Sequence, residues 1–127
     1  MPFVRIDLIE GKSDAYRKTI GDVVYDAMRT TIDVPENDRF QVITEHKAAN
    51  FIYDPTYLGV SRTDDCIFIQ ITLNAGRTVE KKRAFYKAIA DGLHTAVGLR
   101  KQDVFINLIE VKRENWSFGK GEAQYAN

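Results

Sequence analysis

The chain has 127 residues, of which 44% are hydrophobic, enough for one domain with its own core. Its 18 basic and 18 acidic residues give no net charge, which argues against a nucleic-acid-binding protein. The single cysteine excludes an internal disulfide and a multi-cysteine zinc site. With no apolar run long enough to span a membrane and no signal-peptide pattern, we expect a soluble, cytoplasmic protein.

The sequence contains an internal repeat, which is visible when the chain is aligned with itself at an offset of 65 residues. The two copies align without a gap, so we expect one domain over residues 1–127, with repeats at about 2–46 and 67–111. The coinciding residues include Phe3 and Phe68, Gly11 and Gly76, Ser13 and Thr78, Asp38 and Asp103, and Phe40 and Phe105.

The first repeat has the pattern of a strand, a helix and a second strand. Hydrophobic and polar residues alternate over residues 3–8, which is the period of a half-buried strand. Ser13 is suited to cap a helix, in which apolar residues recur at helical spacing between residues 16 and 28. A second strand is expected at about residues 39–45.

The second repeat shows the same order. A strand is expected over 67–73, Thr78 is suited to cap a helix with an apolar stripe over 85–97, and a last strand is expected over 104–110. A strand–helix–strand unit with such short connections is a right-handed crossover between parallel strands.

The fold class that follows is α/β (α+β), with tandem β-α-β units forming a four-stranded mixed sheet and two helices on one of its faces. Two helices cannot cover both faces. The uncovered face is expected to carry Phe3, Phe40, Phe68 and Phe105, and exposed aromatic groups of this size favour association into an oligomer.

Two segments lie outside the repeats. Residues 48–65 have the composition of a loop or short hairpin, and the tail from residue 113 is expected to form a C-terminal hairpin. Trp116 and Phe118 in this tail stand beside two glycines. They either fill a gap in the packing or form the wall of a binding pocket.

The start of the chain is the first candidate for chemistry. Pro2 follows Met1, and a small residue in this position normally allows the methionine to be removed. The resulting secondary amine has an ordinary pKa of about 8, which burial or nearby cations lower toward neutrality. It is a candidate general base. The alternatives are that Pro2 only begins a strand, or that a retained Met1 blocks the amine.

Three charged residues are further candidates. Lys12 and Arg77 occupy equivalent places just before the two helices, where the helix dipole disfavours a cation, so each is expected to hold a substrate carboxylate or an acidic neighbour. Asp38 is a candidate to orient a water or polarise a substrate carbonyl. Its equivalent, Asp103, leaves open a shared role in stabilising a turn.

Other catalytic arrangements find little support. His46 and His94 are far apart and are not spaced with carboxylates as metal ligands would be, so no metal or cofactor is expected. Cys66 begins a buried-looking strand and is interpreted as a structural thiol.

Together these features resemble the tautomerase superfamily, through Met1-Pro2, the run over residues 8–14 and the tandem β-α-β units. Among the long members of this superfamily, the chain resembles the malonate semialdehyde decarboxylase group over nearly its whole length. The matching segments are Asp7–Gly11, Val34-Pro35 with Asp38-Arg39, Leu58-Gly59 with Arg62-Thr63, Phe85-Tyr86, and Trp116-Ser117-Phe118-Gly119.

The resemblance implies a homotrimer and assigns roles to individual positions. Pro2 matches the catalytic proline, Asp38 the catalytic aspartate and Arg77 a substrate-binding arginine. The matching apolar pocket wall consists of Trp116, Phe118 and Tyr125. The decarboxylases have a second arginine two residues before the first, where this chain has Ala75.

The sequence therefore predicts an enzyme that interconverts the keto and enol forms of a 2-oxo acid such as phenylpyruvate. Pro2 would be the general acid/base, and Arg77 and Lys12 would bind the small carboxylate substrate. One alternative is decarboxylation of a 3-oxo acid such as malonate semialdehyde, and another is a trimeric binding protein without catalysis.

Overall fold

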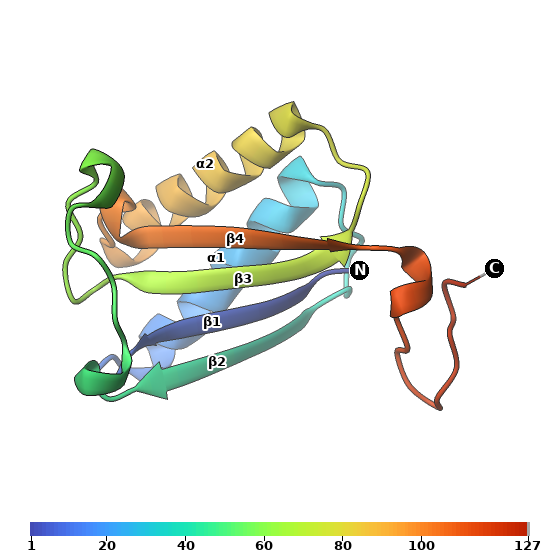
Figure 1. Cartoon of the computed structure of the whole chain (residues 1–127), viewed down its shortest axis with the longest axis horizontal. Coiled ribbons are helices and arrows are strands. Elements are labelled where there is room, and N and C mark those ends of the chain that lie inside the picture. Colours follow the sequence, from blue (N-terminus) through green and yellow to red (C-terminus); the bar gives the residue numbers. More distant parts are fainter. Residues whose placement is uncertain (127) are drawn as a thin grey trace.

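The protein is described here by a computed structural model, which covers residues 1–126 and forms a four-stranded sheet with two helices behind it (Figure 1). The elements are β1 (Phe3–Ile9), α1 (Asp14–Thr31), β2 (Phe40–His46), β3 (Ile67–Asn74), α2 (Val79–Val97) and β4 (Val104–Val111). The strand order is β2-β1-β3-β4, with parallel pairs at both edges and the antiparallel pair β1–β3 at the centre. The expected mixed sheet of two β-α-β units is confirmed.

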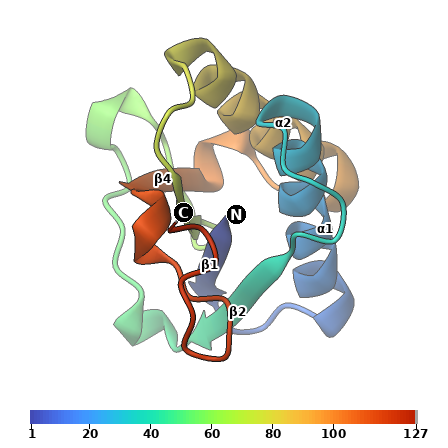
Figure 2. The same cartoon turned by 90° about the vertical axis from the view of Figure 1, so that its right-hand side faces the viewer.

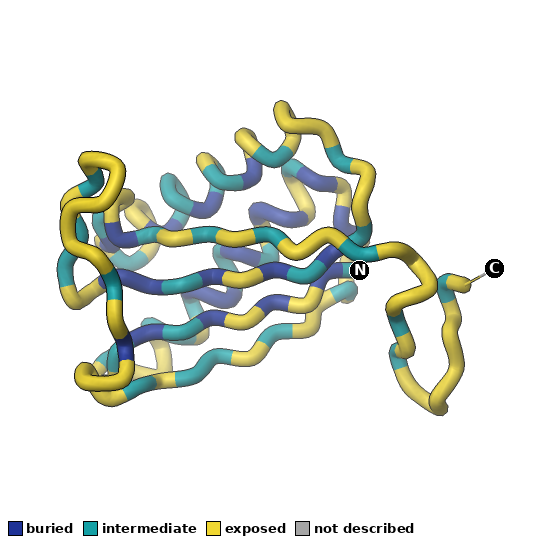
Figure 3. The backbone as a smooth tube through the Cα atoms, viewed as in Figure 1, coloured by how far each residue is buried: buried dark blue, intermediate teal, exposed yellow. Residues whose placement is uncertain are grey.

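Both helices begin at the predicted caps. The Ser13 hydroxyl accepts a hydrogen bond from the Tyr16 N–H at 3.0 Å, and the Thr78 hydroxyl accepts one from the Lys81 N–H at 3.2 Å. Each cap satisfies an N–H group that the start of a helix leaves without a partner. The helices pack on one face of the sheet, where alternate residues of β1 and β3 are buried (Figure 3).

An approximate twofold axis relates the two repeats. Arg5 on β1 pairs with Gln70 on β3, which is its own equivalent at the offset of 65 residues, so the axis passes between these two residues. Because β1 and β3 run in opposite directions, equivalent positions lie at opposite ends of the sheet. The two ends of the sheet are therefore related to each other, and each carries the equivalent positions of one repeat.

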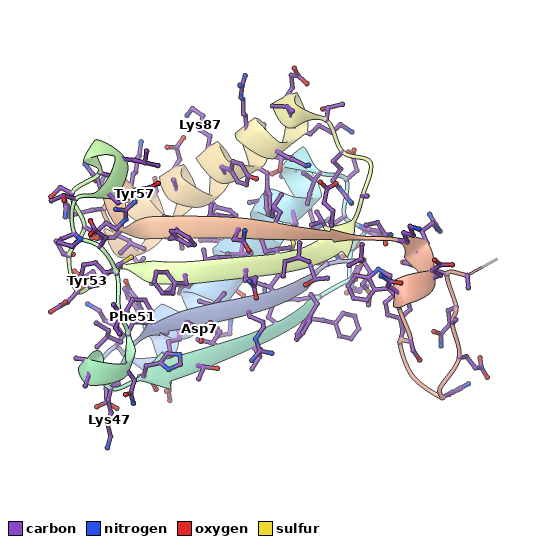
Figure 4. All side chains as sticks on the ribbon, viewed as in Figure 1. Asp7, Lys47, Phe51, Tyr53, Tyr57 and Lys87 are labelled. Carbon is purple, nitrogen blue, oxygen red and sulfur yellow. The ribbon has the colours of Figure 1, made fainter. Side chains whose placement is uncertain are left out.

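The other face of the sheet carries the expected aromatic residues. Phe3, Phe40 and Phe105 are 36%, 50% and 46% exposed. Phe68 is more covered, because Phe51 stacks on it with ring centroids 4.3 Å apart. Figure 4 shows Phe51 in the segment that crosses this face between β2 and β3. In a single chain, most of this apolar face has no cover.

The tail after β4 differs from the predicted hairpin. It leaves the sheet through a short turn at Arg113–Asn115 and loops back on itself without pairing strands in its described part (Figures 1 and 2). The Gln124 side chain holds the loop, because it accepts from the Phe118 N–H and donates to the Gly119 carbonyl, both at 3.0 Å. Gly119 has φ 142° and Gly121 has φ 67°, left-handed conformations that interrupt a strand.

The buried ring of Phe85 on α2 provides a test of this packing. Phe85 is fully buried, so Phe85→Ala leaves a cavity and is expected to lower the free energy of unfolding by about 3–5 kcal/mol in urea denaturation. Val79→Ala on the same helix is the control, because Val79 is 56% exposed and loses little contact. Equal effects of the two substitutions would contradict the assigned core.

Candidate active site

The candidate site lies at the end of the sheet where β1 begins. Phe3, the first residue of β1, pairs with Phe40 on β2 and with Thr72 near the end of β3. The chain start therefore meets the residues that precede β2 and those that follow β3. Asp38 and Arg77 come from these two segments, so the structure brings both of them to the N-terminal amine.

Arg77 is held in place by the backbone around it. Its Nε donates to the Ile32 carbonyl and its Nη1 donates to the Asn74 carbonyl, both at 3.1 Å. Within residues 1–126 no carboxylate forms an ion pair with this guanidinium. The Arg77 residue is half-buried. Its positive charge acts on the nearby Asp38 carboxylate and on the N-terminal amine without a direct ion pair.

Asp38 is a carboxylate without enough partners. Its Oδ2 lies 3.9 Å from the Met1 amine, and its side chain is only 13% exposed. Its Oδ1 is buried and makes no hydrogen bond with any described residue. Burial raises the pKa of Asp38 above its usual value, although the amine and the Arg77 charge oppose that shift.

The repeat equivalent of Asp38 is fully satisfied. Asp103 has no exposed surface, and its two carboxylate oxygens accept hydrogen bonds from the Thr63 N–H and the Thr63 hydroxyl, both at 2.7 Å. Asp103 therefore ties the loop before β3 to the sheet. Asp103 therefore has the turn-stabilising role considered for both aspartates, whereas Asp38 Oδ1 has no partner equivalent to Thr63.

The N-terminal amine is tuned by its surroundings. Burial lowers its pKa below the ordinary value, the Asp38 carboxylate opposes this shift, and the charges of Arg77 and Arg113 add to it. Pro2 is buried, whereas Met1 is half-buried. An amine on Pro2 would thus lie deeper in the same environment.

Aromatic residues of the tail form one wall beside this end. The Trp116 indole N–H donates to the Asn74 side-chain oxygen at 2.8 Å, which fixes the ring. Phe118 stacks on Trp116 with centroids 5.5 Å apart, and Tyr125 meets Phe118 edge-on at 4.7 Å. The tail thus acts as a wall rather than as filler of an internal gap.

This wall closes one side of a cleft of about 230 Å³ at the chain start. The cleft is lined by Met1, Pro2, Phe3, Phe40, Trp116, Ser117 and Phe118. Its lining is predominantly apolar, which suits the hydrocarbon or aromatic part of a small ligand.

Lys12 is not brought to this site within the chain. It follows the end of β1, so it lies at the opposite end of the sheet, where its Nζ pairs with Asp65 Oδ1 at 2.8 Å. Within the single chain, Lys12 therefore does not reach the place where a substrate carboxylate would bind. The alternative expectation, that it pairs with an acidic neighbour, is met. The repeat placed Lys12 and Arg77 in equivalent slots, and the twofold axis separates those slots.

Two further residues of this end were not singled out from the sequence. Asn74 accepts hydrogen bonds from Arg77 and from Trp116. Arg113 lies beside the Tyr125 ring, with its Cζ 4.9 Å from the ring centroid. Neither has a like residue at the equivalent repeat position, so the repeat gave no signal for them. The signal that was available is the predicted parallel pairing of the last two strands, which puts both of their C-terminal ends at one edge.

The remaining candidates stay structural. Burial raises the pKa of the Cys66 thiol to about 11, which disfavours the thiolate that a nucleophile needs. Within residues 1–126, no three His, Cys, Asp or Glu side chains are grouped to hold a metal ion. In the same residues, no helix is long and apolar enough to cross a membrane.

Comparisons with known proteins agree with this arrangement. Residues 38–119 match one family described as "Tautomerase enzyme", and residues 2–61 match a second family with the same description. The chain is 46% identical over 124 residues to the "Probable tautomerase YusQ" of Bacillus subtilis (strain 168), with 98% of each chain covered.

Solved structures give the same result. A malonate semialdehyde decarboxylase inhibited by 3-bromopropiolate superimposes with a TM-score of 0.90 at 37% identity, over 97% of this chain and 93% of the other. A fused 4-OT symmetric trimer shares the fold, with a TM-score of 0.79 at 22% identity and 98% of each chain covered. With two family matches and a full-length relative, this chain belongs to the tautomerase family of enzymes.

Proposed function

We propose that the protein catalyses keto–enol tautomerisation of a 2-oxo acid with an aryl side chain, such as phenylpyruvate, with Pro2 as the general acid/base. The observation that carries this proposal is the contrast between the two ends of the sheet. At one end Thr63 donates two hydrogen bonds to Asp103 and Lys12 pairs with Asp65, whereas at the other the buried Oδ1 of Asp38 has no hydrogen-bond partner among the described residues. A buried polar atom without a partner costs stability, and active sites are where such a cost is retained.

The proposal requires that Met1 is removed. Met1 lines the cleft, so its removal would open space for a substrate next to Asp38 and leave the secondary amine of Pro2 facing that space. Burial and the Arg77 charge lower the pKa of the amine at this place, which favours the unprotonated form that accepts a proton from carbon.

In this mechanism the substrate carboxylate binds the Arg77 guanidinium. The Pro2 nitrogen removes a proton from C3 of the keto acid, the C2–C3 bond becomes double, and the C2 carbonyl oxygen becomes an enolate. Protonated Pro2 then returns this proton to the enolate oxygen, which gives the enol and the free amine. The Arg77 charge stabilises the developing enolate. Asp38 orients a water or polarises the carbonyl group, and its raised pKa suits it to share a proton.

The aromatic wall supplies the rest of the site. Trp116 and Phe118, with Tyr125 behind them, would take the aryl ring and exclude water from the reacting end. Excluding water strengthens the interaction of Arg77 with the enolate.

A second candidate function is decarboxylation of a 3-oxo acid such as malonate semialdehyde. The similarity to a solved malonate semialdehyde decarboxylase and the carboxylate of Asp38 favour it. It requires a protonated Pro2, whereas the surroundings lower the pKa of the amine. Ala75, in place of a second arginine, also weighs against it.

We also propose that the protein acts as a homotrimer. The apolar sheet face with Phe3, Phe40 and Phe105 needs cover, and the fused 4-OT of the same fold is a trimer.

The role of Pro2 is tested by substitution. Pro2→Ala removes the secondary amine and is expected to lower kcat/KM for phenylpyruvate enol at least about 100-fold, measured by ultraviolet absorbance. Pro55→Ala, in the exposed loop between β2 and β3, is the matched control and should keep the activity. Intact mass should show that wild type lacks Met1.

The pH profile separates the two candidate functions within the same experiment. If Pro2 acts as a base, kcat/KM rises with pH through an amine pKa below about 8, whereas decarboxylation by protonated Pro2 falls with pH. Full tautomerase activity in Pro2→Ala would refute the tautomerase proposal and leave a trimeric binding protein.

The two equivalent aspartates are expected to respond oppositely to the same change. Asp103→Ala leaves the Thr63 N–H and hydroxyl without partners and should lower the free energy of unfolding by about 2–3 kcal/mol, with the site unchanged. Asp38→Ala should lower kcat/KM about 100-fold without loss of stability at neutral pH.

The stability of Asp38→Ala also has a predicted pH dependence. Burial raises the pKa of Asp38 in the folded state, so ionising Asp38 costs more in the folded than in the unfolded protein and lowers the free energy of unfolding. At low pH, where Asp38 is protonated in both the folded and the unfolded state, this cost is absent. Asp38→Ala should thus gain stability relative to wild type as the pH rises from about 4 through the folded-state pKa of Asp38. The opposite slope in urea denaturation would show that Asp38 is stabilised by a partner.

The trimer is tested on the uncovered face. Phe105→Glu places a charge among the exposed aromatic residues and is expected to reduce the mass in light scattering from three copies of the 14.5-kDa chain to one. Val79→Glu changes an apolar residue on α2 that is 56% exposed, against 46% for Phe105, and should leave the trimer intact. A trimer that tolerates Phe105→Glu would mean that another surface forms the interface.

A further inference from the structure

A second cavity lies near the candidate site, beside the ends of β3 and β4. Its volume is about 430 Å³, and the residues that matter in its lining are Asn74, Ala75, Lys112, Arg113, Glu114 and Tyr125. Two cations and one carboxylate give it a net positive charge. The cleft beside Pro2, in contrast, is lined mainly by apolar groups. The two cavities thus differ in the ligand groups they can bind.

Arg113 is held at this cavity by the tail. Its Cζ lies 4.9 Å from the centroid of the Tyr125 ring, a cation–π contact that orients the guanidinium while leaving its N–H groups available. Within residues 1–126 it forms no ion pair, and Glu114, in the same lining, does not reach it. Ala75, which has a small side chain, lines the same cavity, and both Ala75 and Arg113 are exposed to solvent there.

Asn74 links the lining of this cavity to the reacting end by hydrogen bonds. The Asn74 carbonyl accepts from Arg77, and its side-chain oxygen accepts from the Trp116 indole. The next residue, Ala75, donates its N–H to the Val111 carbonyl at 3.0 Å, so the segments that carry Arg77 and Arg113 are tied together. The Arg113 charge also contributes to the lowered pKa of the N-terminal amine.

We propose that Arg113 is a specificity-determining residue that binds a second carboxylate, at the end of the substrate remote from the reacting carbonyl. The site would then accept 2-oxo dicarboxylic acids as well as aryl 2-oxo acids. A guanidinium binds a carboxylate through two parallel hydrogen bonds, which a lysine cannot reproduce. This inference rests on the proposed function, because it takes Arg77 and Pro2 as the reacting end.

Trp116 makes a binding test possible without turnover. It is the only tryptophan of the chain, and it lines the apolar cleft while its indole N–H is bonded to Asn74 in the lining of the basic cavity. Its fluorescence should report the binding of unreactive substrate analogues. Glutarate, a dicarboxylate, and 3-phenylpropanoate, a monocarboxylate with an aryl group, are the two probes.

Arg113→Gln is expected to raise the Kd of glutarate about tenfold and to change that of 3-phenylpropanoate less than about twofold. Arg113→Lys should be intermediate for glutarate. Arg83→Gln on α2 removes the same charge from an exposed position outside the site and should change neither value. The kcat/KM for oxaloacetate enol should fall in parallel, with that for phenylpyruvate enol retained.

A variant of Ala75 tests the same cavity independently of Arg113. Ala75→Glu adds a carboxylate to the lining of this cavity and should weaken glutarate binding through charge repulsion, again with little effect on 3-phenylpropanoate. This variant keeps the proposal testable if Arg113→Gln does not fold.

Equal weakening of both probes by Arg113→Gln, or no change in either, would overturn the proposal. The proposed function fails differently, through activity that does not depend on Pro2. The fluorescence titrations need no turnover. The difference in glutarate Kd between wild type and Arg113→Gln is therefore measured whether or not the protein tautomerises phenylpyruvate.

Discussion

The antiparallel pairing of β1 with β3 is the constraint on which the candidate site depends. It sets the first residue of β1 opposite Thr72, so the loop that carries Arg77 ends beside the N-terminal amine. The parallel pairing of β1 with β2 brings Asp38 to the same edge. A slip of two residues would move Arg77 by about 7 Å along the strand, and a slip of one would turn the buried side chains outward. The buried residues of β1 and β3 therefore hold the site in register.

Much of the fold was predictable because its determinants are local. The alternation in the strands, the helical spacing and the caps Ser13 and Thr78 each depend on a few neighbouring residues, and all are confirmed. The site was less predictable, because the repeat specifies which residues are equivalent but not how far apart they lie. Lys12 was grouped with Arg77 on that basis, and the axis between Arg5 and Gln70 separates them.

Asp38 and Asp103 show a second limit of sequence reasoning. They are the same residue type in the same slot, and nothing around them in the repeat distinguishes their roles. The difference arises from Thr63, in the segment that joins the repeats, which donates two hydrogen bonds to Asp103. No described residue does the same for Asp38 Oδ1. Arg113 was missed for a related reason, since it lies in the tail beyond the repeats.

Joining two repeats in one chain makes their ends chemically unequal. A polypeptide has one α-amino group, and the position equivalent to Pro2 is Ile67, whose nitrogen belongs to a peptide bond at the start of β3. Without an amine, an open carboxylate and cation at that end would add the cost of buried charge and no chemistry. The buried charge at that end is Asp103, which accepts two hydrogen bonds from Thr63 and lies 3.7 Å from the Arg100 guanidinium, while the more exposed Lys12 pairs with Asp65. The unsatisfied Asp38 is therefore explained by the proposed amine beside it rather than by the architecture that both repeats share.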